Sequence, residues 1–293
     1  PAVLVRRHRV AVRELHRQVL TGDPALATGP SAVPSLTVPT GRRPGGPHQL
    51  PAAPSRFTGR TVQLAAIDAA LTGASGHGEG VPICVISGAG GMGKSWLALH
   101  WAAANLDRFP DGQLHVNLRG FDPVGEPTTA ASAVRALLDA FDVPAAALPA
   151  SAQAQAGLYR SLTAGRRMLI VLDNARDSDQ VIPLLPGSAT CAVLVTSRHR
   201  LTGLVIAHGA RPIMLDALTG PECRSLLAGR LDARRLAAEP AAVDQLLRYC
   251  AGLPLALGIV AARATTEPDV PLAALARELS TVARRLDALD VGE

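Results

Sequence analysis

The stretch VPICVISGAGGMGKSWLALHWAA, residues 81–103, decides the fold of this chain. It opens with a short apolar run at 81–86 that is rich in β-branched residues, as is typical of a buried strand. The segment GAGGMGKS at 88–95 then matches the pattern G-x-x-x-x-G-K-[ST] without a mismatch. Leucines, alanines and two tryptophans follow in a helix-forming sequence. A strand, a glycine-rich turn and a helix in this order predict a phosphate-binding loop.

Each residue type in this loop suits a phosphate site for a physical reason. The glycines let backbone N–H groups approach phosphate oxygens, because no Cβ stands in the way. The helix after the loop adds the positive end of its dipole. Lys94 offers an ammonium group to the β- and γ-phosphates, and the Ser95 hydroxyl offers a ligand to Mg²⁺. A turn that binds nothing is the alternative, and the joint occurrence of strand, motif and helix disfavours it. The glycines concerned are Gly88, Gly90, Gly91 and Gly93.

Length and composition indicate a globular protein with a sizeable core. The chain has 293 residues, of which 48% are hydrophobic, and a net charge of +5. At about 100–200 residues per domain, it holds one large domain or two smaller ones. It has no signal peptide and no apolar run near the ~18 residues of a membrane helix, so we expect no membrane partner. Since it does not begin with Met, we expect it to be a piece of a longer protein.

Four cysteines are spread over the chain without a C-x-x-C spacing. Two of them fall inside predicted strands. We therefore expect reduced core thiols in a cytoplasmic protein rather than a disulfide framework or a metal site. The four are Cys84, Cys191, Cys223 and Cys250.

The N-terminal part differs in character from the rest. Residues 1–20 have the pattern of a basic amphipathic helix. We interpret residues 1–21 as the end of an upstream helical domain; contact with nucleic acid is the alternative, disfavoured because no aromatic residue interleaves the arginines. Residues 22–55 are rich in proline, glycine, serine and threonine, which predicts an extended or disordered linker.

Alternating strand and helix patterns over residues 56–216 predict an α/β domain built on a parallel sheet. Ligands of such sheets bind beyond the carboxyl ends of the strands. After residue 217 the strand signals stop and helical patterns continue to 293, which predicts a small all-helical domain. A capping box, Thr219 to Glu222, opens its first helix. The predicted fold is a P-loop NTPase sheet flanked by helices and followed by this helical domain. The predicted strands are 81–86, 112–118, 167–172, 191–196 and 211–215.

Two of these strands end in polar residues that suit a nucleotide site. Asp173 ends an apolar strand, where its carboxylate can hold Mg²⁺ directly or through water; capping of the next helix is the alternative. After the strand at 191–196, Thr196 or Ser197 can sense a γ-phosphate and Arg198 can pair with it; a surface arginine is the alternative. Asn174 stands where many such ATPases carry a second acid. Because an amide is no base, fast hydrolysis is not expected.

Four signatures stand in one order: FTGR at 57–60, GAGGMGKS, LIVLDN with VTSR, and GLPLAL at 252–257. Together they resemble the NB-ARC module of the STAND class of signalling NTPases, over about residues 56–290. The segment RELHRQVLTGDPAL at 13–26 resembles the end of the bacterial transcriptional activator domain in large, AfsR-like SARP regulators of actinobacteria.

The resemblance implies roles for individual residues in binding ATP or ADP with Mg²⁺. Phe57 and Arg60 would lie at the adenine and its sugar, and Pro254 would pack on the adenine side. The loop from Gly90 to Ser95 would hold the phosphates, Met92 included, and we count the adjoining Trp96 with it. Ser95 and Asp173 would bind the metal. The residues that take part in weak ATP hydrolysis would be Lys94, Asp173 and Arg198.

The expected function is that of a nucleotide switch in a cytoplasmic transcriptional regulator of antibiotic biosynthesis. ADP would close the two domains, and ATP would open them and permit self-association. Contacts with DNA and RNA polymerase would lie in domains outside this chain, as would a winged-helix domain that completes the nucleotide site. The alternatives are an ordinary turnover ATPase of AAA+ type and an interaction scaffold that does not switch.

Overall fold

The computed structural model describes residues 46–72, 80–122 and 125–289. The helix predicted over 1–20, the upstream domain at 1–21 and most of the linker at 22–55 lie outside these residues. The described chain begins with a segment that runs beside a strand: Gln113 donates its N–H to the Pro47 carbonyl at 2.6 Å. His48 pairs with Gln113 in an isolated parallel bridge. The last part of the predicted linker is thus anchored to the sheet by backbone hydrogen bonds.

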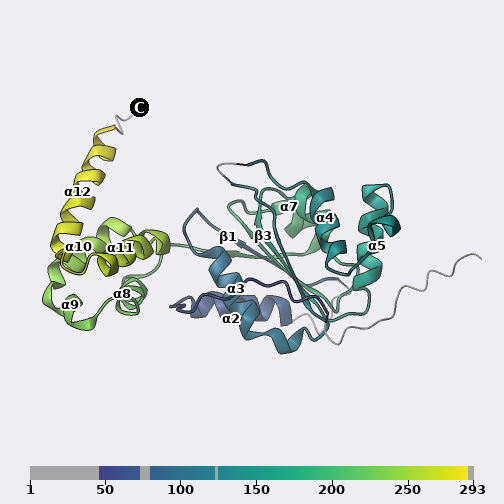
Figure 1. Ribbon diagram of the computed structural model, residues 1–293, viewed down its shortest axis with the longest axis horizontal. Helices are drawn as coiled ribbons and strands as arrows, with labels where there is room; N and C mark the ends of the chain where they lie inside the picture. Colours follow the sequence, from purple (N-terminus) through teal and green to yellow (C-terminus); the bar gives the residue numbers. More distant parts are fainter. Residues whose placement is uncertain (1–45, 73–79, 123–124, 290–293) are drawn as a thin grey trace, which may run out of the picture. The chain divides into compact units, whose positions relative to one another are not determined.

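Five parallel strands form one sheet, as the alternation of patterns predicted (Figure 1). Their order is β2-β3-β4-β1-β5. Because β1 lies between β4 and β5, the glycine-rich loop leaves from the interior of the sheet and not from its edge. The strands are β1 (Ile83–Ser87), β2 (Gln113–Asn117), β3 (Leu169–Ala175), β4 (Ala192–Ser197) and β5 (Arg211–Met214).

Helices cover both faces of this sheet, which is why β1, β3 and β4 are almost continuously apolar (Figure 1). Alternate residues of β1 point to opposite faces. Cys84 and Ile86 pack in one apolar cluster with residues of α2 (Thr61–Thr72) and α3 (Lys94–Ala104). Ile83 and Val85 belong to a second cluster with residues of four other helices. Those helices are α4 (Ala130–Asp139), α5 (Ala152–Thr163), α6 (Ser178–Val181) and α7 (Thr202–His208).

After β5 every described element is a helix, as predicted for the part beyond residue 217. Leu227, Leu246 and Leu257 come from three of these helices and share an apolar core of their own. The predicted capping box is present: the Thr219 hydroxyl and the Glu222 carboxylate each bind the other's backbone N–H. The helices are α8 (Gly220–Ala228), α9 (Ala233–Ala238), α10 (Pro240–Cys250), α11 (Pro254–Thr266) and α12 (Leu272–Leu289).

Several short elements were not anticipated from the sequence: α6 (Ser178–Val181), α7, α9 and three 3₁₀ turns at Leu106–Arg108, Ala145–Ala147 and Ile182–Leu184. All four cysteines are buried and free, which is the placement expected of core thiols. Burial raises the pKa of the Cys84 thiol to about 12 and that of Cys250 to about 11. Within the described residues, no helix is both long and apolar enough to cross a membrane.

Candidate functional site

The glycine-rich loop joins β1 to α3 and depends on glycine for its backbone conformation. Gly91 and Gly93 have φ angles of 78° and 84°, in the left-handed region that residues with a Cβ rarely adopt. Gly93 is the N-cap of α3, so Lys94 and Ser95 lie in the first turn of this helix. Backbone N–H groups at a helix start have no partner within the helix and can bind an anion. The loop therefore has the geometry that its sequence predicted.

The Lys94 ammonium group lies against the loop itself. Its Nζ donates to the carbonyl oxygens of Gly88 and Ala89, each at 2.8 Å. Burial lowers the pKa of Lys94, the nearby Arg198 lowers it further, and Asp173 opposes this shift. These effects place Arg198 and Asp173 near the same ammonium group. A Cβ added at Gly90 would also lie 3.5 Å from the Arg198 guanidinium carbon, so Arg198 stands beside the loop.

Asp173 lies where β3 departs from regular pairing with β4. Its carboxylate accepts a hydrogen bond of 2.5 Å from the Thr196 hydroxyl, which accepts the N–H of Asn174 at 2.9 Å. Asn174 has a φ of 58°, a conformation that asparagine tolerates better than most residues. Ser197, the other predicted sensor, is buried and donates instead to the Ala175 carbonyl at 2.6 Å. Of the two hydroxyls, the one beside Asp173 belongs to Thr196.

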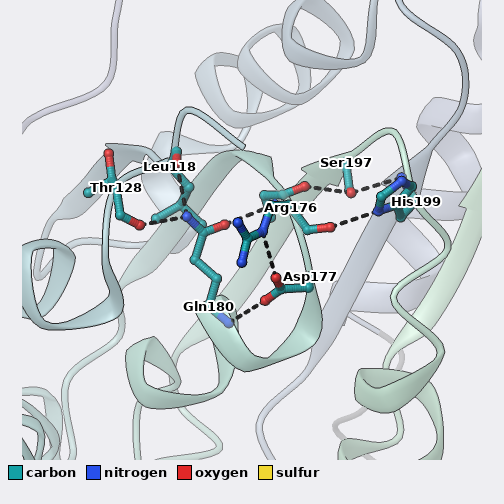
Figure 2. Close-up of polar contacts among 8 residues, drawn as sticks. Leu118, Thr128, Arg176, Asp177, Gln180, Ser197 and His199 are labelled. Atoms are coloured by element: carbon teal, nitrogen blue, oxygen red, sulfur yellow. Dashed lines mark hydrogen bonds and ion pairs between the residues drawn. The ribbon is translucent and has the colours of Figure 1, made fainter. Parts of the chain in front are cut away.

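A polar network holds the segments that follow β2 and β3 (Figure 2). The Gln180 amide donates to the carbonyl oxygens of Leu118 at 2.9 Å and Thr128 at 2.6 Å. Its carbonyl oxygen accepts the N–H of Arg176 at 2.9 Å. Asp177 caps α6 by accepting the N–H of Gln180, and it also pairs with the Arg176 guanidinium. One buried side chain thus joins three backbone segments, which sequence patterns did not reveal.

The same network continues to the segment after β4 (Figure 2). The Ser197 hydroxyl accepts the N–H of His199 at 3.0 Å, and the His199 ring bonds the Arg176 carbonyl at 2.9 Å. The Phe121 ring packs edge-on against His199, with centroids 4.8 Å apart. The Arg198 guanidinium carbon lies over the Phe121 ring, 5.0 Å from its centroid. Phe121 therefore supports Arg198 from the loop after β2, a role that the sequence did not signal.

A cavity of about 470 Å³ adjoins the loop. Its lining comes from the FTGR segment, from the loop with the start of α3, and from helices α8 and α11. Many of the predicted nucleotide-binding residues lie in it together, whereas Gly88, Gly90, Asp173 and Arg198 lie outside the lining. The predicted residues in the lining are Phe57, Arg60, Gly91, Met92, Gly93, Lys94, Ser95, Trp96 and Pro254.

The FTGR segment reaches the cavity through two anchored side chains. The Phe57 ring stacks on His100 with a centroid distance of 4.2 Å. Arg60 is only 5% exposed, and its guanidinium donates to the Met92 carbonyl at 3.4 Å. Burial lowers the pKa of Arg60, while the charges of Glu222 and Asp216 oppose that shift. Arg60 is thus directed at the backbone of the loop.

Glu222 fixes the FTGR segment from the start of α8. Its carboxylate accepts the N–H of Arg60 at 2.9 Å while it also closes the capping box. Gly59 has a φ of 71°, and a Cβ there would lie 2.5 Å from the Glu222 carboxylate. The sequence indicated Glu222 only as a helix cap, and gave no sign that the same carboxylate binds the FTGR backbone.

The first turn of α11 contacts the glycine-rich loop directly. Leu255 donates its N–H to the Gly91 carbonyl at 3.2 Å. A Cβ added at Gly91 would lie 3.1 Å from that of Leu255, and one at Gly93 would lie 3.9 Å from Pro254. Pro254 occupies the first position of α11, where its missing N–H leaves no bond unmade. The GLPLAL signature therefore lies against the loop; whether Pro254 contacts adenine stays a prediction.

The donors near the loop suit Mg²⁺ rather than a metal held by protein alone. Among the described residues, no three His, Cys, Asp or Glu side chains gather as a metal site. Magnesium takes one or two protein oxygens and completes its shell with water and substrate phosphates. The half-buried Ser95 hydroxyl and the Asp173 carboxylate are oxygen donors of this kind.

Comparison with known proteins shows that this sequence is similar to part of two bacterial regulatory proteins. It is 38% identical over 288 residues to the regulatory protein AfsR of Streptomyces coelicolor and 37% identical over 286 residues to that of Streptomyces griseus. The chain is AfsR-like. Each alignment covers 97% of this chain and 28% of the relative, so the AfsR-like chain spans little more than a quarter of these proteins. No family model matches it.

Solved structures show that the AfsR-like chain has the fold of P-loop ATPases. The ORC2 protein of Aeropyrum pernix, in complexes with ADPNP and ADP, matches 78% of this chain and 69% of its own, with a TM-score of 0.54 at 15% identity. A Walker-type ATPase of Pyrococcus abyssi matches 84% of this chain and 77% of its own, with a TM-score of 0.52 at 10% identity.

Proposed function

We propose that this chain is a nucleotide-binding regulatory module that takes ADP and ATP with Mg²⁺. One observation carries the proposal: Lys94 and Ser95 of a phosphate loop line the same cavity as Phe57, Arg60 and Pro254. The cavity lining is largely apolar, includes four cationic side chains and includes no acidic one. A ligand with an apolar ring and a chain of phosphates matches both properties. The cations are Arg56, Arg60, Lys94 and Arg230.

Within this module, each polar group has a proposed role in a slow hydrolysis. Lys94 neutralises the phosphates, Ser95 and Asp173 hold Mg²⁺, and Arg198 pairs with the terminal phosphate. Asn174 offers an amide where a base would be needed, so turnover is slow. Phe57, Arg60 and Pro254 hold the nucleoside, and Met92 and Trp96 complete the wall of the cavity. Gly88, Gly90, Gly91 and Gly93 give the loop its shape.

We further propose that the nucleotide acts as a switch, as in NB-ARC modules of STAND proteins. Two contacts support this: Leu255 bonds the Gly91 carbonyl, and Glu222 bonds the Arg60 backbone. Both join the helical part to the segments that would hold the nucleotide. ADP then favours the closed arrangement, and ATP favours opening and self-association. The proposed domains are 56–216 and 217–293.

The longer protein is proposed to act as a cytoplasmic regulator of transcription in antibiotic biosynthesis, because its relatives are regulatory proteins. Contacts with DNA and RNA polymerase are assigned to parts outside this chain. Residues 1–21 are then the end of an upstream helical domain, and residues 22–55 are the linker to the module.

A binding titration with ADP and Mg²⁺ tests the central proposal. Loss of the charged hydrogen bonds of Lys94 in a Lys94→Ala variant should weaken ADP binding by roughly ten- to a hundredfold. An exposed cation elsewhere provides the control, and Arg234→Ala should bind as the wild type does. If the wild type binds no nucleotide, the chain is instead a scaffold. Sustained, fast release of phosphate from ATP would identify an ordinary turnover ATPase.

A second measurement uses the fact that Lys94 is the only lysine of the sequence. An amine-reactive reagent modifies it without competition from other side-chain ammonium groups. We expect ADP with Mg²⁺ to protect Lys94 from modification, as read by peptide mass spectrometry. Adenosine, which has no phosphate, should protect it far less.

A further inference from the structure

Arg230 differs from the other three cations that line the cavity. Lys94 donates to the loop carbonyls of Gly88 and Ala89, Arg60 donates to Met92, and Arg56 donates to the carbonyl of Gly229. For Arg230, the described residues provide neither a side-chain hydrogen bond nor an ion pair. Its guanidinium instead lies over the ring of Trp96, 5.7 Å from the centroid. Its N–H donors therefore remain available to a ligand.

The surroundings of Arg230 leave room for its guanidinium. Gly258 lies inside α11, where glycine lowers helix propensity relative to alanine. A Cβ at Gly258 would come within 3.1 Å of Arg230 Nη1. Trp96, whose ring lies under the guanidinium, follows Ser95 directly in the first turn of α3. Arg230 is thus held between the phosphate-loop helix and α11, at the wall of the cavity.

A cation in such a wall needs an anionic partner. The cavity lining supplies no carboxylate, and guanidinium groups match phosphate oxygens with paired N–H donors. We propose that Arg230 binds the phosphate chain of the nucleotide from the helical part, opposite Lys94. This inference rests on the proposed function and adds a ligand-binding residue to it. The nucleotide would then be held between charges from both parts of the chain.

Titrations with ADP and with adenosine test this proposal in the whole chain. Arg230→Gln should weaken ADP binding roughly tenfold or more and leave adenosine binding unchanged, because only ADP carries phosphates. Arg230→Lys keeps the charge but loses the paired donors, so its affinity for ADP should lie between those of the wild type and Arg230→Gln. The control is Arg234→Gln, an exposed arginine of α9, which should change neither affinity.

Gly258→Ala provides a test in which packing and binding act in opposite directions. The added methyl group should stabilise α11 and displace the guanidinium, so ADP affinity should fall while the melting temperature does not. Unchanged ADP affinity in both Arg230→Gln and Gly258→Ala would overturn the inference and leave the proposed function intact. Equal losses for ADP and adenosine in Arg230→Gln would also overturn it, since Arg230 would then act through packing. A wild-type chain that binds no ADP would overturn both.

Fluorescence gives an independent readout, because the chain has two tryptophans. Trp96 is 48% exposed, whereas Trp101 is 3% exposed, and Trp101→Phe leaves Trp96 as the reporter. Binding of ADP should move the guanidinium on the Trp96 ring and change its emission. In the double variant Trp101→Phe with Arg230→Gln, saturating ADP should no longer change the Trp96 emission. A change in emission that persists in this double variant counts against the proposal.

Discussion

The hydroxyl of Thr196 joins the Asp173 carboxylate to the backbone of the next residue. It donates to the carboxylate at 2.5 Å and accepts the N–H of Asn174 at 2.9 Å. Thr196 is 1% exposed, so water does not replace either partner. A hydroxyl has one proton and can both donate and accept, which no apolar side chain of the same shape can do. The position of the proposed metal ligand is therefore set by the neighbouring strand.

Replacing this hydroxyl should affect both stability and metal-dependent binding. Thr196→Val keeps the shape but leaves the Asn174 N–H and one carboxylate oxygen without their partner. We expect the free energy of unfolding to fall by about 1–3 kcal/mol, as measured by urea denaturation. The gain in ADP affinity on adding Mg²⁺ should shrink as well. Thr196→Ser, which keeps the hydroxyl, is the control, and a valine variant as stable as this control contradicts the prediction.

Glu222 should make stability depend on pH in the acid range. The hydrogen bond from the Arg60 N–H lowers the pKa of this carboxyl most. Burial, the second-largest effect, raises this pKa, and the bonds from Thr219 lower it further. A carboxyl whose pKa is lower in the folded state stabilises that state at pH values above its unfolded pKa, near 4.5. This stabilisation is lost as the pH falls through the folded pKa. The difference in unfolding free energy between wild type and Glu222→Gln should therefore shrink from pH 6 towards pH 3. A constant difference over this range argues against the prediction.

Gly59 and Gly157 should respond in opposite directions to the same added methyl group. At Gly59 a Cβ would meet the Glu222 carboxylate at 2.5 Å, and φ is 71°. We expect Gly59→Ala to lower the free energy of unfolding by about 1–3 kcal/mol. Gly157 lies inside α5 with open space around it, so Gly157→Ala should raise the free energy of unfolding by about 0.5–1 kcal/mol. Thermal melts of the two variants test this prediction, and equal shifts of the melting temperature would contradict it.

Gln180 should be more important to the fold than its short helix suggests. Gln180→Leu removes the side-chain partners of the Thr128 carbonyl and the Arg176 N–H, and one of the two donors to the Leu118 carbonyl, which keeps the N–H of Thr128. We expect a loss of roughly 2–4 kcal/mol in urea denaturation, because buried polar groups are left unpaired. Asp179 lies beside it in α6 and is exposed, so Asp179→Ala should change stability by less than about 0.5 kcal/mol. Similar losses of unfolding free energy in both variants would show that disruption of α6, and not loss of the Gln180 hydrogen bonds, causes the destabilisation.

The sequence predicted those parts of the fold whose signals are local. The strand before the loop, the glycines of the loop and the helix after it are consecutive, so one stretch contains the whole pattern. The capping box at Thr219 is equally local, and it is present. The short helix α9 was missed because six residues carry too little periodicity to separate a helix from a loop.

The parts that escaped prediction depend on contacts between distant residues. Glu222 and Arg60 are 162 residues apart, so the pattern around either one contains no sign of their hydrogen bond. The same holds for Gln180, which bonds the Leu118 carbonyl from 62 residues away. Only the sheet order brings such segments together. The roles of the site residues in binding stay predictions that the titrations above can decide.

The hydrogen bond from Leu255 to the Gly91 carbonyl has a mechanical consequence. If an arriving phosphate rotates the peptide plane that follows Gly91, this carbonyl turns with it and the Leu255 amide loses its acceptor. Rotation of a single peptide group in the loop would then release the first turn of α11. The peptide rotation in the loop and the displacement of α11 would then occur together. A spectroscopic label on α11 would therefore report the rotation of the loop peptide.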